Sequence, residues 1–186
     1  MSPRELLSIL STAERLKDTT RHCYTSKGRQ ESVAEHTWMM SFMALLLSEE
    51  FPDVDMNKVL KMCIIHDLGE CFTGDIPTFD KTVSDSKVEE ELLKDWVGTL
   101  PFDTSKKLTE IYKEMEEMET KEAKVYKALD SLEALIQHNL SDLSTWSEHE
   151  KTFNLSYADK RVTFSKFLSE LREEIRNDTI KKLSKT

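Results

Sequence analysis

The stretch "VLKMCIIHDLGE", residues 59–70, limits the choice of fold more than any other part of the chain. At helical spacing its side chains are apolar on almost every side, and a helix of this kind is normally buried. The apolar run nevertheless ends in two ionisable residues, His66 and Asp67. An unpaired carboxylate in apolar surroundings costs several kcal/mol or takes up a proton. Asp67 therefore requires a cation, a salt-bridge partner or an exposed position at the helix end.

The composition favours helices throughout. The chain has only 4 glycines and 4 prolines, too few to supply the turns of a many-stranded sheet. The helix-forming residues Leu, Met, Glu, Lys and Ala are abundant. We therefore expect an all-α protein. A length of 186 residues predicts one domain over residues 1–186, a compact helical bundle that buries a core of its own.

Hydrophobic periodicity and capping residues predict the helix positions. The segment "SVAE", residues 32–35, is a capping-box pattern that opens a helix. We expect a loop around Pro77, because the residue before a proline avoids helical geometry, and a frayed tail over residues 176–186. Further candidate N-caps are Asp55, Asp103 and Thr120, and Gly69 is a candidate helix end. The expected helices cover residues 3–15, 32–51, 55–68, 86–97, 103–116, 120–140 and 162–175.

Charge and cysteine content narrow the partners and the compartment. A formal net charge of -9 argues against long DNA or RNA, whose binders carry a basic face. Residues 15–29 hold five basic residues against one acid, so a small phosphate compound could bind there. No apolar run reaches the ~18 to 20 residues needed to cross a bilayer, so we expect no membrane partner. Three cysteines, which cannot all pair, and the lack of a signal peptide predict a cytoplasmic protein.

A divalent metal would satisfy His66 and Asp67 together, through an imidazole nitrogen and a carboxylate oxygen. The alternative is a structural, hydrogen-bonded His-Asp pair. Two other residues interrupt apolar helices in a similar way: His36, near the start of its helix, and Asp130 in the helix expected over 120–140. Neither alone indicates a metal, because core histidines are usually hydrogen-bonded and such aspartates usually lie at the wet edge of an apolar stripe.

Taken together, the order "H…HD…D" resembles the HD-domain metal-dependent phosphohydrolases. Within them the chain is most similar to the 5'-deoxynucleotidase type, through "RQESVAEHTW", "CIIHDLGECFTGDIPT" and "KALDSLEAL". The resemblance covers Arg21 and extends to about residue 140, so it implies a metal-site core over about residues 20–140. The C-terminal helix and tail, about residues 160–186, add nothing to it.

The resemblance implies one divalent ion per chain and favours manganese or cobalt. Mg, Fe and Zn are also compatible with such ligands. It also implies that Glu70 orients or deprotonates the attacking water, and that Asp75 lies beside the phosphate or the leaving oxygen. Arg21 would bind the phosphate, with Thr78 close to the nucleotide. The implied metal ligands are His36, His66, Asp67 and Asp130.

The chain departs from the family pattern at His22, where the deoxynucleotidases have a tryptophan near the sugar. A smaller, polar ring there could relax the exclusion of a ribose hydroxyl, so the resemblance leaves the choice between ribose and deoxyribose open. Without the resemblance, simpler interpretations stay open for three of these residues: Glu70 as an exposed acid, Asp75 as a turn residue beside glycine, and Arg21 as a surface arginine.

These features predict a metal-dependent phosphomonoesterase that hydrolyses nucleoside 5'-monophosphates, including deoxynucleotides, to nucleoside and phosphate. The family also suggests a homodimer. Alternatives are an HD hydrolase of nucleoside triphosphates, cyclic nucleotides or alarmones, and a nucleotide-binding regulator without catalysis. A di-iron oxygenase on the same scaffold needs further histidines between Asp67 and Asp130, and the chain has none there.

Overall fold

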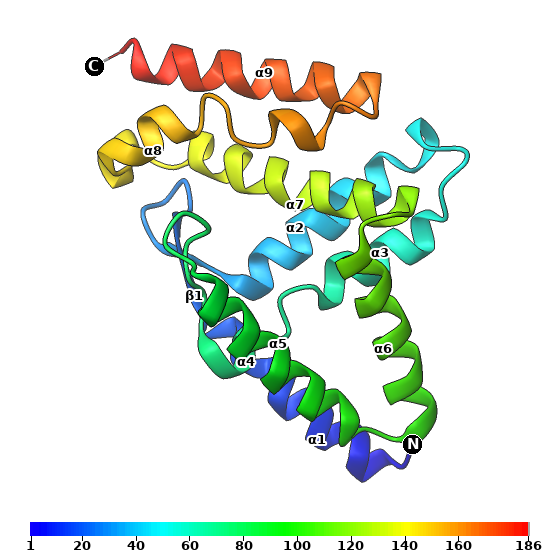
Figure 1. The fold of residues 1–186 in the computed structure, drawn as a ribbon. Helices are drawn as coiled ribbons and strands as arrows, with labels where there is room; N and C mark the ends of the chain where they lie inside the picture. The colour runs from blue at the N-terminus through cyan, green and yellow to red at the C-terminus, as the bar shows by residue number, and fades with distance from the viewer. Residues whose placement is uncertain (186) are drawn as a thin grey trace.

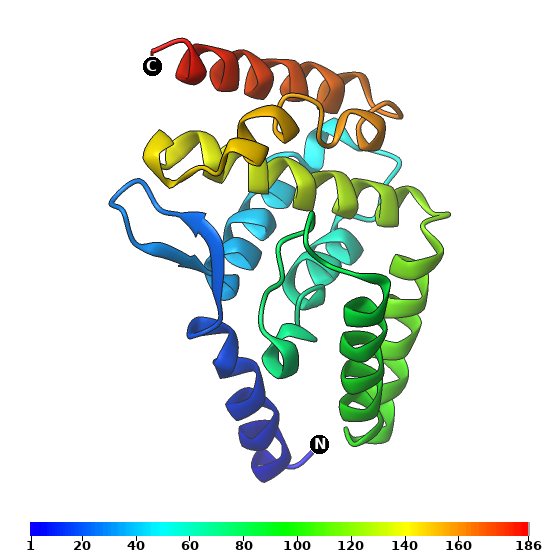
Figure 2. The same ribbon diagram turned by 60° about the vertical axis from the view of Figure 1, so that its left-hand side comes forward.

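A computed structural model describes residues 1–185 of the chain as a bundle of helices with one short β-hairpin (Figures 1 and 2). The α-helices are α1 (Pro3–Ala13), α2 (Val33–Leu46), α3 (Met56–Ile65), α4 (Glu70–Thr73), α5 (Val83–Gly98), α6 (Phe102–Glu117), α7 (Lys121–Leu140), α8 (Glu148–Phe153) and α9 (Lys166–Leu183). The strands are β1 (Thr20–Tyr24) and β2 (Gln30–Ser32), and short 3-10 turns lie at Glu14–Lys17, Ser48–Glu50, Leu143–Thr145 and Asp159–Arg161. The prediction of a helical fold is confirmed, apart from the short hairpin.

Helix α7 forms the centre of the molecule. It packs against α2 and α3 on one side and α9 on the other, and α9 lies across one end of the molecule in both views (Figures 1 and 2). Leu129 and Leu132 on α7 are completely buried, as are Met40 of α2 and Met62 of α3. Because α7 carries buried residues on so many sides, it provides the rigid support on which a site can be built.

Local capping signals fixed several helix starts as predicted. Ser32 accepts a hydrogen bond from the Glu35 amide, and the Glu35 side chain in turn accepts one from the Ser32 amide. Asp55 and Thr120 accept bonds from the amides of Lys58 and Ala123. Asp103, however, is not a cap: α6 begins at Phe102 after Pro101, and Asp103 lies in its first turn, where a carboxylate favours the positive end of the helix dipole.

The apolar helix departs from the prediction in two ways. It is not buried on every side, because the Ile64 side chain is 57 % exposed. It also ends at Ile65 rather than at Gly69, and the Tyr112 hydroxyl donates a 2.7 Å hydrogen bond to the Ile65 carbonyl oxygen there. The turn that follows packs closely against α5 at Gly69, where an added Cβ would lie 2.7 Å from Cγ of Glu89. His66 and Asp67 therefore stand just beyond the end of α3.

Two further segments differ from expectation. The hairpin β1–β2 was not predicted; it pairs Thr20 with Ser32 and Tyr24 with Gln30 in an irregular antiparallel ladder. Gly28 in its turn has a φ of 79°, a left-handed conformation that favours glycine. The tail expected to fray is helical as far as Leu183, because Ile175 and Thr179 are buried against the bundle; Thr186 lies outside the described residues.

Helix α1 lies at the opposite end of the molecule from α9 and projects from the bundle (Figures 1 and 2). None of its residues is buried, and Leu6, Leu7 and Leu10 are each about half exposed. None of the helices in residues 1–185 is long and apolar enough to cross a membrane.

Candidate active site

Two histidines and two aspartates converge from α2, from the turn that follows α3, and from α7. Nε2 of His36, in the first turn of α2, lies 3.3 Å from Nε2 of His66. Asp67 Oδ2 lies 3.0 Å from His66 Nε2 and 3.8 Å from His36 Nε2. Asp130 Oδ1, from α7, lies 3.3 Å from His36 Nε2 and 3.7 Å from His66 Nε2. The structure brings together all four residues that the sequence marks as possible metal ligands.

The two imidazoles are held from behind so that their Nε2 atoms face each other. His66 Nδ1 lies 3.0 Å from the Cys63 carbonyl oxygen and donates to it. His36 Nδ1 donates to the carboxylate of Glu133. Both Nε2 lone pairs then point into the same space, which is unfavourable unless a proton or a cation lies between them. Two imidazole nitrogens and two carboxylates, fixed by such outer bonds, form a donor set that suits a divalent metal ion.

The charges of the site favour added positive charge. Burial opposes the protonated form of His66, yet the carboxylates of Asp67 and Asp130 outweigh it and raise the pKa of His66 to about 10. Burial likewise opposes the ionised form of Asp67, and His66 outweighs it, which lowers the pKa of Asp67 to about 2. In an ion-free protein these charges therefore favour a proton on the His66 imidazole. A divalent cation can supply the same positive charge in its place.

Glu70 and Asp75 lie close to this centre. Glu70 is the first residue of α4, is only 6 % exposed, and its Oε2 has no hydrogen-bond partner within the described chain. Burial raises the pKa of Glu70 to about 9, and the charges of Asp67 and Asp75 add to the effect. Asp75 lies in the loop after α4, where burial raises its pKa and Arg21 opposes the rise. Neither is a simple surface acid: both carboxyl groups bind protons more tightly than usual.

Arg21, His22 and Thr78 line a small cavity of about 40 Å³ beside the loop after α4. Arg21 on β1 is buried, with Nε 3.6 Å from Glu31 Oε2, and neither its Nε nor its Nη1 has a hydrogen-bond partner among residues 1–185. A buried guanidinium with free donors is suited to an anionic ligand. His22 Nε2 instead lies 3.0 Å from Glu150 Oε1.

Sequence analysis missed several charged side chains of the site. Glu133, completely buried, holds His36, and its Oε2 lies 3.9 Å from Arg21 Nη1. Its spacing from Asp130, three residues along one helix face, was the signal that could have identified it. Lys127 was not predicted either, and its Nζ lies 2.7 Å from Asp130 Oδ2. Lys127 lines a cavity of about 530 Å³ together with His66, Lys81 and Arg161.

Comparisons with known proteins identify the family. The family model for the HD domain matches residues 13–172. The 5'-deoxynucleotidase HDDC2 of Bos taurus is 34% identical over 138 residues, which are 72% of this chain and 66% of that protein, so the match spans just under two thirds of the relative.

Solved structures share the fold. A protein of Magnetospirillum magnetotacticum MS-1, named a predicted metal-dependent phosphohydrolase, superposes with a TM-score of 0.82 at 26% identity and covers 96% of this chain and 93% of that one. The HD phosphohydrolase DatZ of cyanophage S-2L, bound to dA and one catalytic zinc ion, superposes with a TM-score of 0.59 at 20% identity over 95% and 96% of the two chains. At that identity the likeness to DatZ concerns the fold alone.

The fold and the family match define a helical HD-domain protein with a candidate metal centre. The chain belongs to the HD-domain family.

Proposed function

We propose that this protein is a metal-dependent phosphomonoesterase that hydrolyses nucleoside 5'-monophosphates, including deoxynucleotides, to nucleoside and phosphate. The observation that carries the proposal is the convergence of His36 and His66 Nε2 with the carboxylates of Asp67 and Asp130. The name of the bovine relative, 5'-deoxynucleotidase, supports the choice of substrate.

One divalent ion would be held by His36, His66, Asp67 and Asp130, within a core of about residues 20–140. Nitrogen and carboxylate donors accept several metals; we propose manganese or cobalt first, with Mg, Fe or Zn as alternatives. When bound, such an ion polarises the phosphate oxygens and lowers the pKa of a coordinated water.

Glu70 and Asp75 would move the protons of the reaction. Glu70 would orient the attacking water and accept its proton, since its Oε2 is buried without a hydrogen-bond partner in the described chain. As the water oxygen forms its bond to phosphorus, the ester bond to the nucleoside oxygen breaks. Asp75, whose pKa burial raises, then protonates the leaving oxygen. Glu70 is buried and Asp75 is partly buried, which limits the access of bulk water to these protons.

Arg21 would bind the substrate phosphate through the donors that lack partners. His22 and Thr78 would lie next to the nucleoside, since both line the same small cavity as Arg21. The cavity of about 530 Å³ beside His66 offers space of the size that small-molecule sites occupy, and its lining balances three basic residues against three acidic ones: Lys81, Lys127, Arg161, Glu89, Glu90 and Glu116.

We also propose a cytoplasmic homodimer that binds neither nucleic-acid polymers nor membranes. All three cysteines, Cys23, Cys63 and Cys71, are unpaired, which suits a reducing compartment. The exposed leucines of α1 and the stacked, exposed rings of Trp38 and Phe42 on α2 provide apolar surface for a second copy. The net charge of -9 disfavours polyanions.

The test is phosphate release from a panel of ribo- and deoxyribonucleoside mono-, di- and triphosphates. Metal-stripped protein is resupplied separately with Mn²⁺, Co²⁺, Mg²⁺ or Zn²⁺. We expect release from monophosphates alone, and the ratio of ribose to deoxyribose rates reports the effect of His22. Preferential attack on triphosphates, or no release with any metal, would overturn the proposal.

A further inference from the structure

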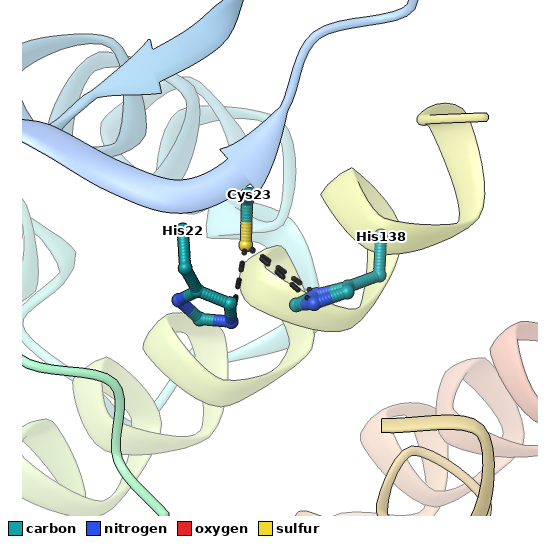
Figure 3. Close-up of side chains that lie close together, drawn as sticks. All are labelled: His22, Cys23 and His138. Atoms are coloured by element: carbon teal, nitrogen blue, oxygen red, sulfur yellow. Dashed lines mark hydrogen bonds between the residues drawn. The ribbon is translucent and has the colours of Figure 1, made fainter. Parts of the chain in front are cut away.

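A second group of side chains of the kinds that bind metals lies beside the small cavity that Arg21 and Thr78 line (Figure 3). His22 and Cys23 extend from β1 towards His138 on α7, and Glu150 of α8 completes the group. His138 follows Asp130 by eight residues on the same helix, which corresponds to about 12 Å along its axis. The group therefore belongs to a different level of the bundle from the four converging residues described above.

The ligand atoms of this group lie close together. Oε1 of Glu150 lies 3.0 Å from His22 Nε2 and 2.8 Å from His138 Nε2. Cys23 Sγ lies 3.9 Å from His22 Nε2 and 3.8 Å from His138 Nε2. Zinc binds sulfur at about 2.3 Å and nitrogen or oxygen at about 2.0 to 2.2 Å, so a tetrahedral site separates its ligand atoms by about 3.3 to 3.6 Å. The two carboxylate separations are shorter than that range and the two sulfur separations are longer, each by about 0.5 Å or less.

The side chains are also held in the way that metal ligands usually are. His138 Nδ1 lies 2.8 Å from the Ala134 carbonyl oxygen, a bond that leaves Nε2 as the ligand atom. Oε2 of Glu150 accepts a 2.6 Å bond from the Ser147 amide, which leaves Oε1 free to bind. Cys23, His138 and Glu150 are all more than nine-tenths buried, so the group is enclosed by protein.

A purely hydrogen-bonded cluster explains these contacts less well. Glu150 Oε1 can accept from both imidazoles only if each carries a proton on Nε2. His138, which already donates from Nδ1 to Ala134, would then be a buried cation. Among residues 1–185 the polar contacts of Cys23 Sγ are to imidazole nitrogens, the shortest of them 3.4 Å from His138 Nδ1. One bound cation would organise all four side chains at once.

We propose that His22, Cys23, His138 and Glu150 bind a zinc ion, in addition to the ion of the active site. A thiolate with two imidazoles and a carboxylate is a donor set that zinc accepts, and four protein ligands give a closed, structural site. The ion would join β1 to α7 and α8 and thereby fix the position of Arg21, the neighbour of His22 in β1. In that role Arg21 approaches the phosphate from a rigid strand.

The test is a titration of the metal-stripped full chain with Co²⁺, followed by absorbance and by metal content after gel filtration. A thiolate bound to Co²⁺ gives a sulfur-to-metal charge-transfer band, whereas His36, His66, Asp67 and Asp130 offer only nitrogen and oxygen. We expect two ions per chain and a charge-transfer band in the wild type. Cys23→Ser should lose the band and one ion, whereas the matched control Cys71→Ser should retain both.

One ion per chain without a charge-transfer band in the wild type would overturn the proposal, whatever the variants do. A band that survives in Cys23→Ser would also overturn it. If Cys23→Ser does not fold, Glu150→Gln tests the same site, because its amide oxygen can still accept from Ser147; we expect it to lose the second ion. These measurements do not depend on phosphatase activity, so their failure leaves the proposed function standing.

Discussion

Replacing Glu133 by glutamine should weaken metal binding in the active site. Glu133 is completely buried and accepts the Nδ1 proton of His36, which leaves Nε2 free to bind an ion. Glutamine has the same shape, and its oxygen can still accept that proton, but the negative charge behind the imidazole is lost. Removal of such supporting groups typically costs about 10- to 100-fold in metal affinity. That loss corresponds to about 1.4 to 2.8 kcal/mol of binding free energy.

Because glutamine preserves the hydrogen bond, we expect the lower end of that range for Glu133→Gln and the upper end for Glu133→Ala. The assay is competition for Mn²⁺ with a chelator of known affinity. The control is Glu117→Gln on α6, whose carboxylate is half exposed and lies 3.6 Å from Lys113 at the surface. Equal Mn²⁺ affinity in Glu133→Gln, Glu133→Ala and the wild type would refute the idea that Glu133 positions His36.

Three further predictions concern catalysis, stability and assembly. Glu70→Gln should lower kcat at least about 100-fold, the usual contribution of a general base, while metal content stays at the wild-type level; wild-type kcat would exclude Glu70 as the base. Leu132→Ala should lower the free energy of unfolding by about 2 to 5 kcal/mol in urea, because the Leu132 side chain is completely buried in α7; a loss below about 1 kcal/mol would contradict its place in the core. Leu10→Asp on α1 should shift sedimentation from dimer to monomer with little change in Tm, since α1 buries no residue in its own chain; an unchanged dimer would place the interface elsewhere.

Short-range signals made much of the fold predictable. Ser32, Asp55 and Thr120 each bond an amide three residues ahead, so the sequence specifies the start of three helices without help from the rest of the chain. The end of α3 was not predictable in this way. It coincides with a bond from Tyr112, 47 residues further along, to the Ile65 carbonyl. The hairpin was not predicted for a different reason: its two short strands carry no clear alternation of apolar side chains.

In the candidate site, too, local patterns identified some residues and missed those that depend on long-range packing. His36, His66, Asp67 and Asp130 stood out because each interrupts an apolar pattern, and the structure places them together. Glu133 did not stand out, because an acid on a helix is normally a solvated residue and only packing shows that it is buried. The group around Cys23 was equally hidden: its ligands come from β1, α7 and α8, which approach one another only in the folded chain.

The most direct test of the account measures the hydrolysis of a deoxynucleoside monophosphate while metal-stripped protein is titrated with Mn²⁺, for the wild type and for Asp130→Asn. Far-ultraviolet circular dichroism confirms that both chains are folded. We predict that phosphate release by the wild type is absent without metal and rises with added Mn²⁺, whereas Asp130→Asn releases none at the same concentrations. Phosphate release by the metal-free wild type, or wild-type rates in Asp130→Asn, would contradict the account.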